Sequence, residues 1–147
     1  MQRMNVMIRL SRRSERGAAA VEMAIVLPLL LLVVGGLVDF GRAYYINVVI
    51  TNAAREGARM VAMGYTPAQA TTRANQAAVG LGSLGPVAPT YTTCPSATGN
   101  ATATIAIPTG PANNQFHWLV LNVVPSFFGG SVPTPSLSAT GSMRCNG

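Results

Sequence analysis

The stretch Arg12-Arg13-Ser14-Glu15-Arg16-Gly17, together with the apolar segment Ala18–Val38 that follows it, decides the fold of this chain. Glu22 is the only charged residue between Ala18 and Val38. A helix of about 20 apolar residues is long enough to cross the hydrocarbon core of a bilayer. No later stretch of the sequence is both long and apolar enough to do so. The sequence therefore predicts one transmembrane helix with a small domain attached to its far end.

The helical pattern continues beyond the apolar segment, and Gly64 is its predicted C-cap. Thr66 and Pro67 are typical of the N-cap and first position of a second helix, which we expect to continue to about Val79. The predicted fold class is α+β: a long N-terminal transmembrane helix that extends into a small extracytoplasmic domain with a second helix and a small antiparallel sheet. The predicted segments are a leader (1–17), the transmembrane and extended helix (18–64), the second helix (65–82) and a β region (83–147).

Three strands are predicted in the β region. Alternating apolar and polar residues favour strands over 101–107 and 137–145, because side chains in a strand point to opposite faces in turn. The nearly continuous apolar run His117–Val124 is typical of a buried central strand. A weaker strand is predicted over 89–94.

The charge of the chain is concentrated in its leader. All ten basic residues are Arg, and with four acidic residues they give a formal net charge of +6. Five Arg residues and Glu15 precede Gly17, so loss of the leader would lower the charge to 6 − (5 − 1) = +2. A short basic flank stays in the cytoplasm, which places the N-terminus inside and the C-terminal domain outside. The basic balance therefore indicates membrane orientation, with no nucleic-acid partner. We expect Met1–Arg16 to be disordered or removed.

The two cysteines, Cys94 and Cys145, both follow the helix. In an oxidising compartment they can form a disulfide, which would help to stabilise a domain with a small core. Two buried free thiols are the alternative.

The sequence offers no convincing catalytic constellation. After Asp39 the only acidic residue is Glu56, and the chain has one histidine, His117. A membrane-tethered hydrolase would need these two residues to come together, and a metal site would need three or four ligands from His117, Glu56 and the two cysteines. We therefore predict no enzyme, no metal, no cofactor and no small-molecule substrate.

The segment from Gly17-Ala18-Ala19-Ala20-Val21-Glu22 to Pro28 resembles the processing site of type IV prepilins, most closely that of the TadE-like pseudopilins of tight-adherence pilus systems. The similarity extends through Asp39-Phe40-Gly41-Arg42 and Ala53-Ala54-Arg55-Glu56-Gly57-Ala58-Arg59. It implies a structural pseudopilin of the bacterial cytoplasmic membrane, used in pilus assembly or a related secretion apparatus. It also implies a cut between Gly17 and Ala18 by a prepilin peptidase, and other pilins and assembly proteins as partners.

Glu22 would be the fifth residue of the processed chain. A carboxylate at the edge of an apolar span is costly without a partner. The new amino group of Ala18 lies one helical turn away, so it could pair with Glu22 of its own chain or of a neighbour. The alternative is that Glu22 extends to the lipid headgroups.

Other residues of the helix are candidates for packing and assembly. Pro28 should kink the helix or loosen one turn, and the pair Gly35-Gly36 would let another helix approach closely. The predicted i,i+3 ion pair between Asp39 and Arg42 marks the outer end of the span, followed by Tyr44 and Tyr45 as interfacial aromatic residues.

The run from Arg55 to Arg59 has two interpretations. Arg55 and Arg59 share a helix face, and Glu56 reaches Arg59 at i,i+3. The run is either a solvated helix face or a subunit contact in which Gly57 allows close approach. At the level of the whole protein, the alternative to a pseudopilin is an uncleaved single-pass anchor whose extracytoplasmic β domain binds a ligand.

Overall fold

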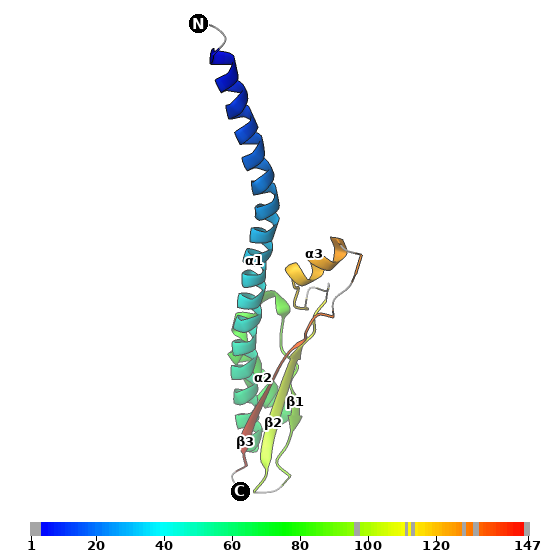
Figure 1. The fold of residues 1–147 in the computed structure, drawn as a ribbon. Coiled ribbons are helices and arrows are strands. Elements are labelled where there is room, and N and C mark those ends of the chain that lie inside the picture. The colour runs from blue at the N-terminus through cyan, green and yellow to red at the C-terminus, as the bar shows by residue number, and fades with distance from the viewer. Residues whose placement is uncertain are drawn as a thin grey trace. The chain divides into compact units, whose positions relative to one another are not determined.

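A computed structural model describes residues 4–95, 98–110, 112, 114–127, 129–130 and 133–145 (Figure 1). The chain divides into two compact units, residues 1–38 and residues 39–147. Helix α1, Met4–Ala62, supplies the first unit and the start of the second. The second unit continues with α2 (Pro67–Ala77), the 3-10 helix η1 (Val79–Leu84), β1 (Thr90–Thr92), β2 (Asn100–Ile107), α3 (Val120–Phe127) and β3 (Leu137–Arg144). The predicted α+β class is confirmed.

The sequence predicts that Met1–Arg16 is disordered or removed. Met4–Arg16 is helical, so disorder is wrong for these residues, and residues 1–3 lie outside the described residues. No Pro or Gly interrupts this segment, and Arg, Met and Leu are good helix formers. At the other end of α1, Gly64 has a positive φ of 85° and its N–H donates to Val61 O at 3.0 Å. The predicted C-cap is confirmed, since a left-handed glycine at this position lets the chain leave the helix.

Helix α2 begins as its sequence predicts. The Thr66 side chain accepts a hydrogen bond from Gln69 N, and the Gln69 side chain accepts one from Thr66 N. This reciprocal capping box, with Pro67 at the first turn, satisfies two of the free N–H groups at the helix start.

The sheet has three antiparallel strands in the order β1-β2-β3. β2 pairs with β3 along its whole length, from Asn100 opposite Arg144 to Ile107 opposite Leu137. The shorter β1 pairs only three residues with β2. The buried residues of β2 are those that alternate along one face: Ala101, Ala103, Ile105 and Ile107. This face contributes to the core, in which Ile105 packs in one cluster with Ile50, Ala53 and Ala54 of α1.

The predicted central strand at His117–Val124 is wrong. Residues 120–127 form the helix α3 instead, and the sheet has β2 at its centre. An apolar run of this length does not by itself distinguish a buried strand from a short helix. Here the first N–H groups of α3 find a carboxylate acceptor on α1, and this long-range contact favours the helix. Within the second unit, α3 and the last residues of β3 lie at opposite ends of the sheet (Figure 1).

Candidate functional site

The apolar part of α1 is not covered by its own chain. Every residue from Ala18 to Val34 is exposed, including Ile25 at 70% and Leu29 at 64%. Within the described residues, α1 is the one helix long and apolar enough to cross a membrane, by length and composition. A helix that is apolar all round needs a non-aqueous surrounding, which is either lipid or other apolar helices.

The predicted processing residues Gly17, Ala18 and Glu22 all lie on this exposed part of α1. A Cβ atom added to Gly17 would meet nothing within 4 Å, so the backbone here is open to a large partner. Glu22 lies one turn beyond Ala18 and, among the residues with described side chains, has no ion pair or hydrogen bond. Gly17 is inside a continuous helix, where a glycine weakens the helix by roughly 0.5–1 kcal/mol relative to alanine. The site is therefore accessible, and its backbone is easier to unwind than an alanine would make it.

Pro28 and the glycine pair mark the middle and the outer part of the same helix. Pro28 lies inside α1, where it removes one backbone donor without ending the helix. Gly35 and Gly36 are half-buried, and a Cβ atom on Gly36 would meet nothing within 4 Å. This leaves the backbone at Gly36 open to close packing by another helix.

Asp39 has a role that the sequence did not predict. Its side chain is 2% exposed, and its two carboxylate oxygens accept hydrogen bonds from Leu119 N at 3.0 Å and Val120 N at 2.7 Å. Asp39 therefore caps the start of α3 from α1, where a carboxylate satisfies free N–H groups and interacts favourably with the helix dipole.

The predicted ion pair between Asp39 and Arg42 is wrong: these two residues, both within the described part of the chain, form no salt bridge. The Asp39 carboxylate is buried against the backbone of α3, where two fixed N–H donors compete successfully with a mobile guanidinium. The guanidinium of Arg42 instead lies over the ring of Phe116, with its carbon 5.3 Å from the ring centroid. Exposed cation–π contacts of this kind contribute about 0.5–1 kcal/mol.

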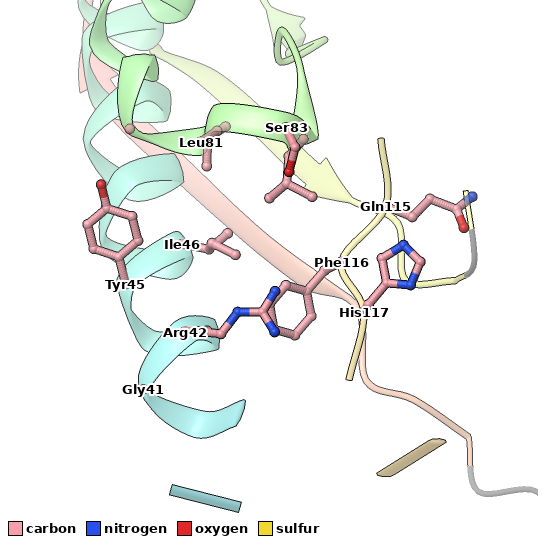
Figure 2. A pocket seen from close by; sticks show the side chains of 11 residues that line it. Gly41, Arg42, Tyr45, Ile46, Leu81, Ser83, Gln115, Phe116 and His117 are labelled. Atoms are coloured by element: carbon pink, nitrogen blue, oxygen red, sulfur yellow. The ribbon is translucent and has the colours of Figure 1, made fainter. Parts of the chain in front are cut away.

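Aromatic side chains surround this contact. The ring of Trp118 meets Phe116 edge-on at a centroid distance of 5.0 Å and Phe40 at 6.1 Å. A pocket of about 590 Å³ lies beside this cluster, with Arg42, Tyr45 and Ile46 from α1 on one side and the segment Gln115–His117 on the other (Figure 2). Residues of η1 complete the wall. The Asp39 end of the second unit is thus built from long-range contacts.

Glu56 joins α1 to α2. Its carboxylate accepts a hydrogen bond from Arg73 Nε at 2.9 Å and lies 3.8 Å from Arg59 Nη1. The i,i+3 pair with Arg59 was predicted, but the stronger contact with Arg73 was not, because it joins two helices that are distant in sequence. Arg55 and Arg59 are exposed, and Glu56 forms the ion pair of this run with another helix. Pairs as exposed as these contribute at most about 1 kcal/mol each.

Gly57 is used inside the domain. It is buried, and a Cβ atom at this position would lie 3.1 Å from Tyr91 Cε1 and 3.5 Å from Ala103 Cβ. Gly141 of β3 lies on the sheet side of the contact between α1 and the sheet. A Cβ atom on Gly141 would lie 2.5 Å from the backbone of Ala54. The two glycines therefore let α1 and the sheet approach closely, and the proposed subunit contact at Gly57 has no free surface there.

The cysteines form a disulfide between the segment after β1 and the end of β3. The Cα atoms of Cys94 and Cys145 are 5.9 Å apart, and Cys145 is buried in a small cluster with Val61 and Ala101. The bridge closes the chain at the end of the sheet away from α3. On the chain-entropy model, a loop of this length contributes about 4 kcal/mol to stability.

The two residues considered for hydrolysis have other contacts. Glu56 is held by arginines, and His117 Nε2 lies 3.1 Å from Ala112 O. Over the described ranges, no three His, Cys, Asp or Glu residues are grouped so that they could hold a metal ion.

Residues 17–59 match the model of one protein family, described as TadE-like protein. The match begins at Gly17 and covers Glu22, Pro28, Asp39 and the run from Arg55 to Arg59. The resemblance predicted from this stretch is confirmed, and the segment is TadE-like. No curated protein and no solved structure matches the chain.

Proposed function

We propose that this chain, with its TadE-like segment 17–59, is a structural pseudopilin that is cut after Gly17 by a prepilin peptidase and assembled through its apolar helix. The family match indicates a role in tight-adherence pilus systems, whose TadE-like members are structural rather than catalytic. The observation that carries the finer proposal is the order of features on one exposed helix: basic leader, Gly17, Glu22 and an uncovered apolar segment.

Processing would change both charge and chemistry at the start of α1. Removal of the leader takes away five Arg residues and Glu15, lowering the formal net charge from +6 to +2. It also creates a positively charged amino group on Ala18, one turn from Glu22. The two charges could pair within one chain or between neighbouring chains, which would reduce the cost of keeping Glu22 at the edge of an apolar surrounding.

The apolar helix would have two successive surroundings. Before assembly the exposed residues of Ala18–Val38 lie in the cytoplasmic membrane, with the leader inside and the second unit outside. During assembly the same surface packs against other pilins or assembly proteins, with Gly35 and Gly36 allowing close approach. Little free energy separates the two surroundings, because lipid tails and apolar side chains are similar environments.

The test is the mass of the membrane-purified protein from cells with and without the prepilin peptidase. With the peptidase, we expect a mature chain that begins at Ala18; without it, the full leader remains. Gly17→Leu should block the cut, because a large side chain prevents the extended backbone from entering the peptidase cleft.

Ala20→Leu is the matched control, since it adds the same side chain three residues away on the same exposed helix and should leave cleavage unchanged. An intact N-terminus in cells that contain the peptidase would rule the proposal out.

The pocket beside Arg42 favours a second candidate, an uncleaved single-pass anchor whose outside domain binds a ligand. In that case Gly17→Leu and Glu22→Ala would change neither the location of the protein nor its assembly. The pseudopilin proposal expects both variants to be lost from the assembled structure.

A further inference from the structure

We propose that α3 is a second membrane-contacting element, which lies in the outer leaflet of the bilayer beside the point where α1 leaves it. This inference rests on the proposed single-pass topology of α1, and it adds a lipid surface to the contacts of the second unit. It does not depend on cleavage after Gly17.

The position along α1 at which α3 begins is set by Asp39, through its covalent bond to Val38 and its hydrogen bonds to α3. Asp39 directly follows Val38, the last residue of the apolar segment. Its carboxylate accepts hydrogen bonds from Leu119 N and Val120 N, and Val120 is the first residue of α3. The start of α3 is therefore within one hydrogen bond of the residue at which α1 leaves the hydrocarbon, whatever angle the two units adopt.

The contact is firm enough to hold α3 at this level. Asp39 is 2% exposed and satisfied by two backbone donors, so the carboxylate is neither free nor solvated. Trp118, which precedes α3, is 4% exposed and packs against Phe40 and Phe116. Its ring nitrogen donates to Pro135 O at 3.4 Å, so the residues just before β3 are bound to the same cluster.

The surface that α3 presents suits a lipid interface. Leu119 and Val123 are 50% and 52% exposed and lie four residues apart, on one face. Asn122 and Ser126 form a polar stripe next to them, and Ser126 Oγ donates to Asn122 O at 2.8 Å, so that its hydroxyl is satisfied locally. Placing this face in a lipid interface would therefore remove apolar surface from water without taking a charged side chain out of it.

Charge supports the same placement. The sequence contains no Asp, Glu, Lys or Arg between Arg73 and Arg144, so α3 and the segments on either side of it carry no formal charge. The charged residues of the second unit beyond Arg42 lie elsewhere, at Arg55, Glu56, Arg59, Arg73 and Arg144. Phe40 of α1 is 69% exposed and contacts Trp118 just before α3. Tyr44, 74% exposed, follows one turn later on α1, and tyrosine is enriched at membrane interfaces.

The full-length protein in nanodiscs, with one chain per disc and the native disulfide closed, tests the proposal. An environment-sensitive fluorophore is attached to a cysteine introduced at Val123, and its quenching by brominated lipids is measured. Leu30→Cys reports the span. Met63→Cys is the matched control, because Met63 is 53% exposed, close to the 52% of Val123, and directly follows the last residue of α1. It is 24 helical residues from Asp39, or about 36 Å.

The labels at positions 30 and 123 should lose intensity in brominated lipid and the label at position 63 should not. Quenching at 30 without quenching at 123 would overturn the inference and leave the span intact. A label at 123 that is shielded from water but not quenched would also overturn it, since protein rather than lipid would then cover α3.

Absence of quenching at position 30 would remove the span and the proposed function with it. If Val123→Cys disturbs folding, as judged by the fluorescence of Trp118, the neighbouring exposed position Leu119→Cys gives the same readout.

Discussion

The two units of the chain contain similar apolar residues, but the first unit exposes them and the second unit buries many of them in a core. From Ala18 to Val34 no side chain is buried, whereas Ile50, Ile105 and Phe116 of the second unit are almost completely buried. The second unit folds around its own core, whereas the apolar helix of the first unit needs lipid or other helices around it. The difference shows that hydrophobicity alone does not define a core: a core also needs a second surface to pack against.

The variant with the largest expected effect changes residues of the first unit alone. Leu29→Arg together with Leu32→Arg places two charges in the exposed apolar segment, each at a cost of about 3 kcal/mol for membrane insertion. We expect the protein to be lost from the membrane fraction that resists alkaline extraction. Met63→Arg adds a charge at an equally exposed apolar residue of the second unit and should leave membrane association unchanged. Equal extraction of both variants would contradict the division into two kinds of apolar surface.

Removal of the disulfide should destabilise the second unit alone. Cys94→Ala with Cys145→Ala should lower the free energy of unfolding by about 4 kcal/mol, since the unfolded chain is no longer closed into a loop. Trp118 is the only tryptophan and lies in the second unit, so its fluorescence during denaturant unfolding in detergent reports that unit. Wild-type protein with reductant should behave like the variant, and membrane association should not change. An unchanged unfolding midpoint would mean that the bridge acts only locally, at its own end of the sheet.

The sequence predicted the apolar part of the first unit well, because a helix long and apolar enough to cross a membrane is specified by composition and length, both of which are local. Gly64, Thr66 and Pro67 were predicted for the same reason, as caps act within one helical turn. The apolar run His117–Val124 was predicted as a strand, because its pattern fits either element; from Val120 on it is helical. What decides for α3 is the carboxylate of Asp39, some 80 residues earlier in the chain.

The same limit explains what was missed in the candidate site. Asp39 and Arg42 are three residues apart, so the sequence predicts a pair, but their structural partners are Val120 and Phe116. Glu56 similarly finds Arg73 on another helix. Polar partners from distant segments depend on tertiary packing, which local spacing does not specify.

Asp39→Ala tests whether the cap, rather than the predicted ion pair, stabilises this end of the second unit. The variant leaves two N–H groups at the start of α3 without their acceptor, and we expect a loss of about 1–2 kcal/mol in the free energy of unfolding, followed by Trp118 fluorescence. Arg42→Ala is the discriminating control, because it removes only a cation–π contact worth about 0.5–1 kcal/mol. If Asp39 and Arg42 acted as a pair, the double variant would lose no more stability than Asp39→Ala does.

The smallest expected effect concerns Tyr91, whose ring lies against Gly57 of α1. Its Oη atom is buried and, within the described part of the chain, has no hydrogen-bond partner. An unsatisfied buried hydroxyl costs about 1–3 kcal/mol, and this cost offsets part of the gain from burying the ring. Tyr91→Phe should therefore leave the free energy of unfolding unchanged or raise it by up to about 1 kcal/mol.

The comparison of Tyr91 with an exposed tyrosine separates the hydroxyl from the ring. Tyr65→Phe, at a residue that is 47% exposed, removes a solvated hydroxyl and should have no effect. In the Tyr91→Phe background, Gly57→Ala should be less destabilising than in the wild type, because one of the two Tyr91 atoms at 3.1 Å from the added Cβ has been removed. A loss of stability on Tyr91→Phe would show instead that the hydroxyl has an acceptor.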